Sequence, residues 1–187
     1  MKKRTIYAVM LTGGIVGMIA AFIQTLEKLT LLENKNAILT CDLSSVFSCS
    51  AVLSAWQSSV FGFPNSIMCL ILFTVFAAIA LAGVTGGKLT RKLRLGIQIL
   101  SLGTLGFALW FLEQSIYSIG SLCIFCLFCF SGLLLVNWAW LRLNVADLPI
   151  SQRSRAALAD GIAQGIDIVG WLLLAVIVAS AMILRFG

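Results

Sequence analysis

Two cysteines three residues apart, Cys123 and Cys126, have the type and spacing in this sequence best suited to chemistry. They begin an apolar segment, and on a helix this spacing places both on one face with Cα atoms about 5 to 5.5 Å apart, within disulfide range. At a helix N-terminus, exposed N–H groups and the helix dipole lower the pKa of the first thiol. The pair therefore suits thiol–disulfide exchange, although two small apolar core residues would give the same pattern.

The composition sets the environment of these thiols. Of 187 residues, 60% are hydrophobic and 11% are charged, with a mean hydropathy of +1.06, far outside the range of soluble domains. Five apolar stretches approach the ~20 residues that cross a bilayer: 6–23, 67–84, 95–112, 122–141 and 168–184. We expect an all-α integral membrane protein with five transmembrane helices in a single domain, 1–187.

The basic residues predict how the helices are oriented. Ten of the 13 Lys and Arg residues lie in the segments 2–4, 88–94 and 142–155, which share one side if five helices span the membrane. By the positive-inside rule this side is cytoplasmic, so the C-terminus and the Cys123–Cys126 pair are expected outside the plasma membrane, the inner membrane of a two-membrane cell. The other basic residues are Lys28, Lys35 and Arg185.

No histidine is present, which removes the commonest general base and metal ligand. We therefore expect no metal site, and chemistry that depends on cysteine or on a bound organic molecule. Cys69 and Cys129 fall inside predicted helices, where small core residues are the expected interpretation. The linker 144–167 offers Ser151 as the cap of a surface helix before the fifth span.

The long outer segment 24–66 carries a second pair, Cys41 and Cys49. Apolar residues recur there at three- and four-residue steps, which predicts a short amphipathic helix at the membrane surface with Asp42 as its N-cap: Val46, Cys49, Val52, Leu53 and Trp56. Alone, a disulfide in this loop is a staple that contributes roughly 2 to 3 kcal/mol. If the mobile pair meets the helix pair, the two form a thiol–disulfide relay.

Several motifs in a fixed order resemble the vitamin K epoxide reductase family over about the first 140 residues. They are 41–50 (CDLSSVFSCS), Phe61-Gly62, Asn65-Ser66-Ile67 and Cys123-Ile124-Phe125-Cys126. The resemblance implies a four-helix bundle around a quinone, about 1–143, capped by the cysteine-bearing loop. In bacterial members a peripheral fifth helix follows, here within 144–187, and often leads to a thioredoxin-like domain.

The resemblance also implies an enzyme, a quinone-dependent oxidoreductase that supports disulfide bond formation. A reduced thioredoxin-like partner of the DsbA type would attack the loop disulfide at Cys41, and Cys49 would then attack Cys123. Cys126 would pass the electrons to menaquinone or ubiquinone. Since the chain stops at Gly187, we expect the partner to be a separate secreted or periplasmic protein.

The same resemblance assigns the expected quinone site. Asn65 matches a family position that hydrogen-bonds the quinone carbonyl, Phe61 lies at the cap over the pocket, and Cys126 faces the quinone. An asparagine at the start of a helix is also a common cap. Phe130 stands where animal members carry a tyrosine, which departs from the pattern of vitamin K epoxide reduction.

Two alternatives remain open from the sequence. A quinone-linked thiol oxidase of the DsbB type, of unrelated descent, would have nearly the same biochemistry, but in that family the Cys-x-x-Cys precedes the loop pair. A non-catalytic membrane protein would use its outer cysteines as structural disulfides that do not turn over.

Overall fold

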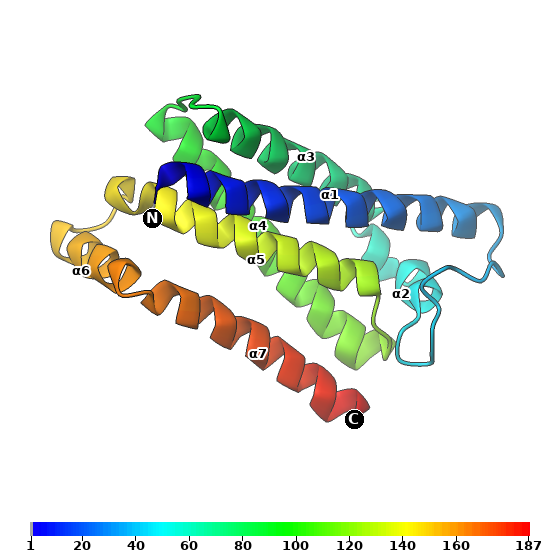
Figure 1. Ribbon diagram of the computed structural model, residues 1–187. Helices are drawn as coiled ribbons and strands as arrows, with labels where there is room; N and C mark the ends of the chain where they lie inside the picture. Colours follow the sequence, from blue (N-terminus) through cyan, green and yellow to red (C-terminus); the bar gives the residue numbers. More distant parts are fainter. Residues whose placement is uncertain (1) are drawn as a thin grey trace.

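The computed structural model describes residues 2–187, and five of its helices are long and apolar enough to cross a membrane (Figure 1). These are α1 (Lys3–Glu33), α3 (Asn65–Val84), α4 (Arg91–Glu113), α5 (Ile124–Asn144) and α7 (Ile166–Phe186). Each overlaps one predicted span, and residues 2–187 form no strand. The expected all-α membrane protein with five spanning helices is confirmed.

Short helical segments connect the spans. α2 (Cys49–Ser54) and a 3-10 turn (Trp56–Ser59) precede α3, and a π-helical turn (Gln114–Ile119) extends α4. After α5, a 3-10 turn (Val145–Asp147) leads to α6 (Gln152–Ala163). The backbone N–H of Ser154 donates to Ser151 Oγ at 3.1 Å, so the predicted cap of the linker helix is confirmed.

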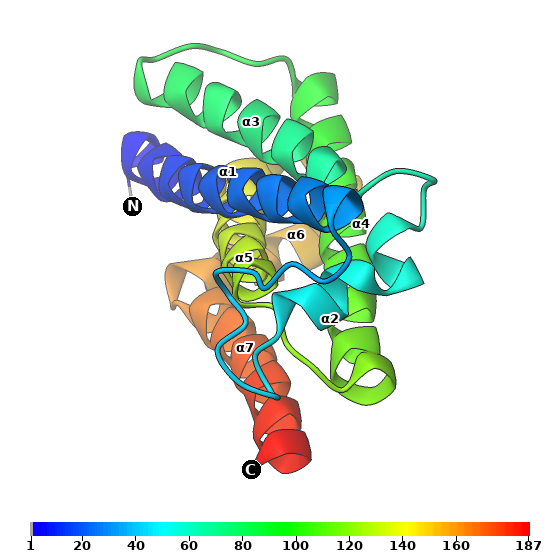
Figure 2. The ribbon, with the colours of Figure 1, turned by 90° about the vertical axis from the view of Figure 1, so that its right-hand side faces the viewer.

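Helix α1 lies between α3 and α5 and packs against both (Figures 1 and 2). Glycines in α1 allow this close approach. A Cβ at Gly13 would lie 2.8 Å from the carbonyl oxygen of Gly132, and one at Gly17 would lie 2.2 Å from the Phe73 ring. Small residues at helix contacts are a common way to bring membrane helices together.

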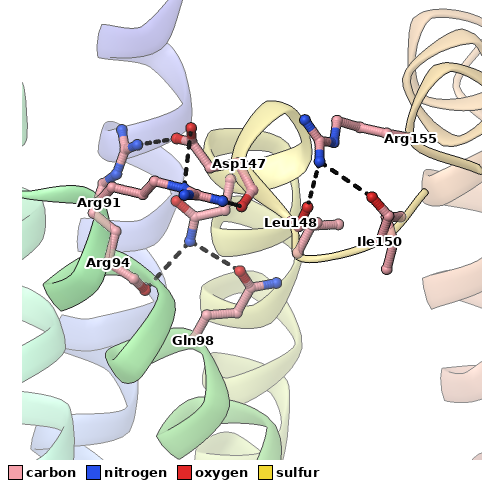
Figure 3. Close-up of polar contacts among 8 residues, drawn as sticks. Arg91, Arg94, Gln98, Asp147, Leu148, Ile150 and Arg155 are labelled. Atoms are coloured by element: carbon pink, nitrogen blue, oxygen red, sulfur yellow. Dashed lines mark hydrogen bonds and ion pairs between the residues drawn. The ribbon is translucent and has the colours of Figure 1, made fainter. Parts of the chain in front are cut away.

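The two ends of the bundle differ in character. The N-terminus, the α3–α4 turn and α6 lie at one end, and α2 and the C-terminus lie at the other (Figure 1). At the first end Arg91 and Arg94 both pair with Asp147, and Arg155 donates to the carbonyls of Leu148 and Ile150 (Figure 3). This network fastens the start of α4 to the end of α5, at the end remote from Cys123.

Helix α7 stands at the edge of the bundle, and none of its residues is buried as a whole, although the Asp167 side chain is. Its main polar attachment is a two-pronged ion pair in which Arg142 Nε and Nη2 lie 2.6 and 2.8 Å from the carboxylate oxygens of Asp167. Both side chains are buried, with exposed fractions of 9% and 2%. The fifth helix is therefore peripheral, as the resemblance implied.

Two expectations for the outer segment were wrong in detail. Helix α1 does not end near residue 23 but continues to Glu33, because Gln24, Glu27, Lys28 and Leu31 form a buried face spaced as one side of a helix. Helix α2 spans only six residues, and its N-cap is Ser48, whose Oγ accepts from the N–H of Ala51 at 3.3 Å, instead of Asp42.

The predicted apolar face of the outer helix is correct only at its centre. Cys49, Val52 and Leu53 are buried within or beneath α2. Val46 precedes the helix in a bend of the chain, and Trp56 follows it, 68% exposed, with its ring 6.4 Å from that of Trp110. The helix is thus a short plug over the bundle.

Candidate functional site

Cys123 and Cys126 stand at the start of α5, where the sequence predicts them. Cys123 is the N-cap residue and Cys126 lies in the first turn. Neither takes part in a disulfide, and Cys123 is buried. The helix therefore holds a reduced dithiol at the end of the bundle that faces α2.

Cys41 and Cys49 form a disulfide with Cα atoms 5.6 Å apart. Cys49 is the first residue of α2, whereas Cys41 lies in the irregular chain that leads to it. The loop pair is therefore oxidised and the helix pair reduced in the same structure.

A backbone pairing sets the loop against the helix pair. Phe47 and Leu122 form an isolated parallel bridge, in which Leu122 N–H donates to Val46 at 2.7 Å and Ser48 N–H donates to Leu122 at 3.1 Å. Cys123 directly follows Leu122, and Cys49 lies two residues after Phe47. As a result Cys49 Sγ lies 3.2 Å from Cys123 Sγ.

Asp42 stabilises the disulfide ring from within. Its carboxylate accepts from the N–H of Leu39 and Ser50, both at 2.9 Å, and from Ser48 Oγ at 3.0 Å. Burial raises the pKa of the Asp42 carboxyl, but the hydrogen bonds from Ser50, Leu39 and Ser48 outweigh it and the pKa is lowered overall. The ionised carboxylate therefore joins the two halves of the loop.

Three of the four sulfurs are closed off from solvent. The exposed fractions are 3% for Cys41, 0% for Cys49 and 1% for Cys123. They belong to one apolar cluster that also contains Leu39, Val52 and Phe111. The loop disulfide is therefore inaccessible from outside while this segment stays closed.

Beneath the thiols lies a cavity inside the bundle, lined from α1, α3, α4 and α5. Its free volume is about 50 Å³, the space of one or two water molecules, so a ring-sized ligand enters only if wall side chains move. Most of its lining is apolar, and Cys126 opens onto it. The cavity therefore offers the Cys126 thiol a contact with an apolar ligand.

Asn65 lies at this cavity as expected. Its Nδ2 donates to the carbonyl of Gln57 at 2.7 Å, and its Oδ1 is buried without a hydrogen-bond partner among residues 2–187. The neighbouring Ser66 Oγ is likewise buried without a hydrogen-bond partner among residues 2–187. These orphaned atoms fit a quinone, because a hydroxyl donates to a quinone carbonyl and an amide oxygen accepts from a hydroquinone hydroxyl.

Phe61 does not line the cavity. It is 50% exposed, and its ring packs 5.5 Å from that of Phe107, which is a wall residue. Phe130 lines the cavity in the position of the animal tyrosine and offers no hydroxyl. Phe61 therefore contacts a wall residue of the cavity, Phe107, and not the cavity itself.

The two remaining cysteines lie beside the cavity. Cys69 of α3 and Cys129 of α5 both line it, and Cys129 Sγ lies 3.7 Å from the carbonyl oxygen of Gly17. They are packed within apolar helices, as the sequence predicts, but the same wall includes Cys126. Three thiols therefore border one cavity.

Sequence reasoning missed two polar residues of α1, Gln24 and Lys28. Gln24 Nε2 lies 2.9 Å from Cys126 Sγ and 3.9 Å from Cys123 Sγ. Lys28 Nζ donates to the carbonyl of Leu53 and, at 3.1 Å, to Ser58 Oγ. Their spacing with Glu27 and Leu31 on one helical face was the signal, hidden because the span was expected to end at 23.

A dithiol at the head of a membrane helix, a disulfide in contact with it and an apolar cavity beside it define a membrane thiol oxidoreductase. The chain belongs to the vitamin K epoxide reductase family, since the model named Vitamin K epoxide reductase family matches residues 8–143. Comparison with curated proteins gave no match. Membership assigns the chain to the quinone-linked thiol oxidoreductases of membranes and excludes the unrelated DsbB type.

Proposed function

We propose that this chain reoxidises a thioredoxin-like protein of the DsbA type and passes the electrons through both cysteine pairs to a membrane quinone. The observation that carries the proposal is the 3.2 Å contact between Cys49 Sγ and Cys123 Sγ. That contact lets one sulfur of the loop disulfide exchange with one thiol of the helix pair. Disulfide formation in secreted proteins is the resulting biological role.

The electrons balance over three exchanges. The partner dithiol reduces the Cys41–Cys49 disulfide and leaves oxidised. The loop dithiol then reduces a Cys123–Cys126 disulfide, with Cys49 attacking Cys123 and Cys126 leaving as the thiolate. A bound quinone supplies the final acceptor of two electrons and two protons, which restores the helix disulfide.

The redox state of the structure has a place in this scheme. The loop pair is oxidised and the helix pair reduced, which is the state after the exchange between pairs and before the electrons leave Cys126. In this state Cys126 borders the cavity and receives a hydrogen bond from Gln24. Asn65 and Ser66 would hold the quinone, with Phe61 supporting the wall through Phe107.

The proposal includes an orientation in the plasma membrane. The cytoplasmic side would carry the N-terminus and the Arg91–Arg94–Asp147 network, and the outer side the cysteines and the C-terminus. A periplasm-active reporter should be silent after Arg94 and active after Gly187. The reverse pattern would contradict the orientation.

The decisive experiment uses purified, fully reduced protein in detergent or nanodiscs. Addition of menaquinone or ubiquinone should reoxidise the cysteines and produce one hydroquinone per disulfide formed. Thiol counting measures the disulfides, and quinone absorbance measures the hydroquinone. Cys126→Ala is the control that should consume no quinone. If the reduced wild type consumes none either, the outer cysteines are structural disulfides and the relay is wrong.

A further inference from the structure

Lys28 places a positive charge at the roof of the cavity. Its side chain is 8% exposed, lines the cavity, and projects from the part of α1 that carries Gln24. Both hydrogen-bond acceptors of Nζ, the Leu53 carbonyl and Ser58 Oγ, are neutral. An ammonium group kept in an apolar membrane protein is costly unless something compensates it.

No carboxylate neutralises this charge directly. The ion pairs among residues 2–187 join Arg91, Arg94 and Arg142 to Asp147 and Asp167, and none of them includes Lys28. The adjacent Glu27 turns its carboxylate to Thr40, accepting from both its N–H and its hydroxyl. The positive charge therefore faces a cavity whose other polar lining groups are uncharged side chains and thiols.

We propose that Lys28 makes this cavity a site for anionic ring ligands. These are a quinone that has taken up electrons and carries negative charge on its ring oxygens, and ionised hydroxyquinones. The inference rests on the proposed function, because it assumes that the cavity is where Cys126 meets the quinone. Negative charge gathers on the ring oxygens when electrons arrive from a thiolate. A cation on the cavity wall stabilises that charge without moving.

A purely structural role for Lys28 has to be separated from this one. The Leu53 carbonyl is near the C-terminal end of α2, so Lys28 also fastens the helix that carries Cys49. Ser58 is attached to the same roof, since its Oγ lies 2.6 Å from the Leu53 carbonyl and 2.7 Å from that of Ala55. Ser58→Ala therefore loosens the roof and leaves the charge in place.

The test measures binding with two probes of nearly equal shape. The first is 2-hydroxy-1,4-naphthoquinone, which is ionised at neutral pH, and the second is its neutral 2-methoxy analogue. Equilibrium dialysis against the full chain in nanodiscs gives both affinities, for the wild type, Lys28→Met, Lys28→Arg and Ser58→Ala. No turnover is needed for the readout.

The wild type should bind the ionised probe at least about tenfold more tightly than the neutral one, the usual scale of a charge-assisted hydrogen bond. Lys28→Arg and Ser58→Ala should keep the preference, and Lys28→Met should lose it. Equal or reversed affinities in the wild type would overturn the inference whether or not Lys28→Met folds. So would a preference that survives in Lys28→Met or disappears in Ser58→Ala.

The outcome also distinguishes this inference from the proposed function. If both probes bind the wild type equally, the quinone cavity stands and only the role of Lys28 fails. If neither probe binds, the cavity does not take quinones and both proposals fall.

Discussion

Cys49 is bonded to Cys41 while its sulfur touches that of Cys123 at 3.2 Å, so one atom belongs to the loop pair and borders the helix pair at once. A thiolate at Cys123 attacks Cys49 and releases Cys41. In the reverse step, the Cys41 thiolate attacks Cys49 and releases Cys123. The exchange between the two pairs therefore requires little movement of the chain. Movement is required instead where a partner reaches the buried Cys41.

Replacing Cys126 should trap the exchange between the pairs. In this variant the Cys123 thiolate attacks Cys49, which breaks the Cys41–Cys49 bond and releases the Cys41 thiolate, and no second thiol on α5 is left to displace Cys49 from Cys123. Most of the Cys126→Ala protein should therefore carry a Cys49–Cys123 disulfide, seen by peptide mapping after acid quenching and thiol alkylation. A protein with only the Cys41–Cys49 bond and a free Cys123 would mark the loop pair as a staple.

Replacing Cys49 should trap the partner. In Cys49→Ala the free Cys41 thiolate attacks the disulfide of an oxidised thioredoxin-like partner and releases the partner's second sulfur as a thiolate. Without Cys49, no thiol of this chain expels the partner, so Cys49→Ala should accumulate a mixed disulfide through Cys41. Non-reducing electrophoresis with mass spectrometry of the shifted band identifies it. The double variant Cys41→Ala, Cys49→Ala is the matched control, and an identical band there would show capture at another cysteine.

Gln24 should increase the reactivity of Cys126. Its Nε2 lies 2.9 Å from the sulfur, and a donor at that distance stabilises a thiolate over a thiol. Gln24→Leu should slow iodoacetamide alkylation of Cys126 in the reduced protein by about fivefold to tenfold at neutral pH.

The control is Gln98→Leu, which removes an equally buried glutamine whose Oε1 accepts from Asn144 at the opposite end of the bundle. This variant should leave the alkylation rate of Cys126 unchanged. Equal slowing in both variants would attribute the effect to a loosened bundle.

Gly17 should tolerate no side chain. A Cβ there would fall 2.2 Å from the Phe73 ring, so Gly17→Val should force α1 away from α3 and destabilise the fold by about 1 to 3 kcal/mol. Thermal unfolding in detergent measures the loss. Gly103→Val in α4 adds the same side chain where no atom beyond the adjoining backbone of α4 lies within 4 Å, and it should unfold near the wild-type temperature.

Cys69 and Cys129 should be dispensable for the relay. Both line the cavity, the thiol at the loop disulfide is that of Cys123, and replacing –CH2SH by –CH3 removes one heavy atom from each side chain. Cys69→Ala and Cys129→Ala should turn over quinone within about twofold of the wild type. If Cys129→Ala lost most of its turnover, the Cys126–Cys129 spacing would have to count as a third dithiol.

The positions of the helix thiols follow from sequence because they depend on local rules. Apolar length sets where α5 runs, and the three-residue spacing sets Cys126 one turn after Cys123. The span of α1 did not follow, since polar residues after Ile23 resemble the end of a membrane helix. Only tertiary packing under α2 buries Gln24 and Lys28 and keeps that segment helical.

Contacts between segments distant in the chain could not be predicted from local sequence patterns for a related reason. The pairing of Phe47 with Leu122 joins residues that are remote in the chain, and no local propensity encodes its register. That register is what brings Cys49 to Cys123. Likewise, Phe61 follows the family motif, yet its exposure depends on how its loop lies over Phe107.

The closure around Cys41, Cys49 and Cys123 insulates the electrons in transit. A small thiol dissolved in the surrounding fluid gains no more access to these sulfurs than the loop itself provides by opening. In the proposed relay, a donor delivers its electrons only by binding the loop and opening it. In the proposed relay, this burial would keep small dissolved thiols from reducing the cysteines and would leave that step to proteins that open the loop.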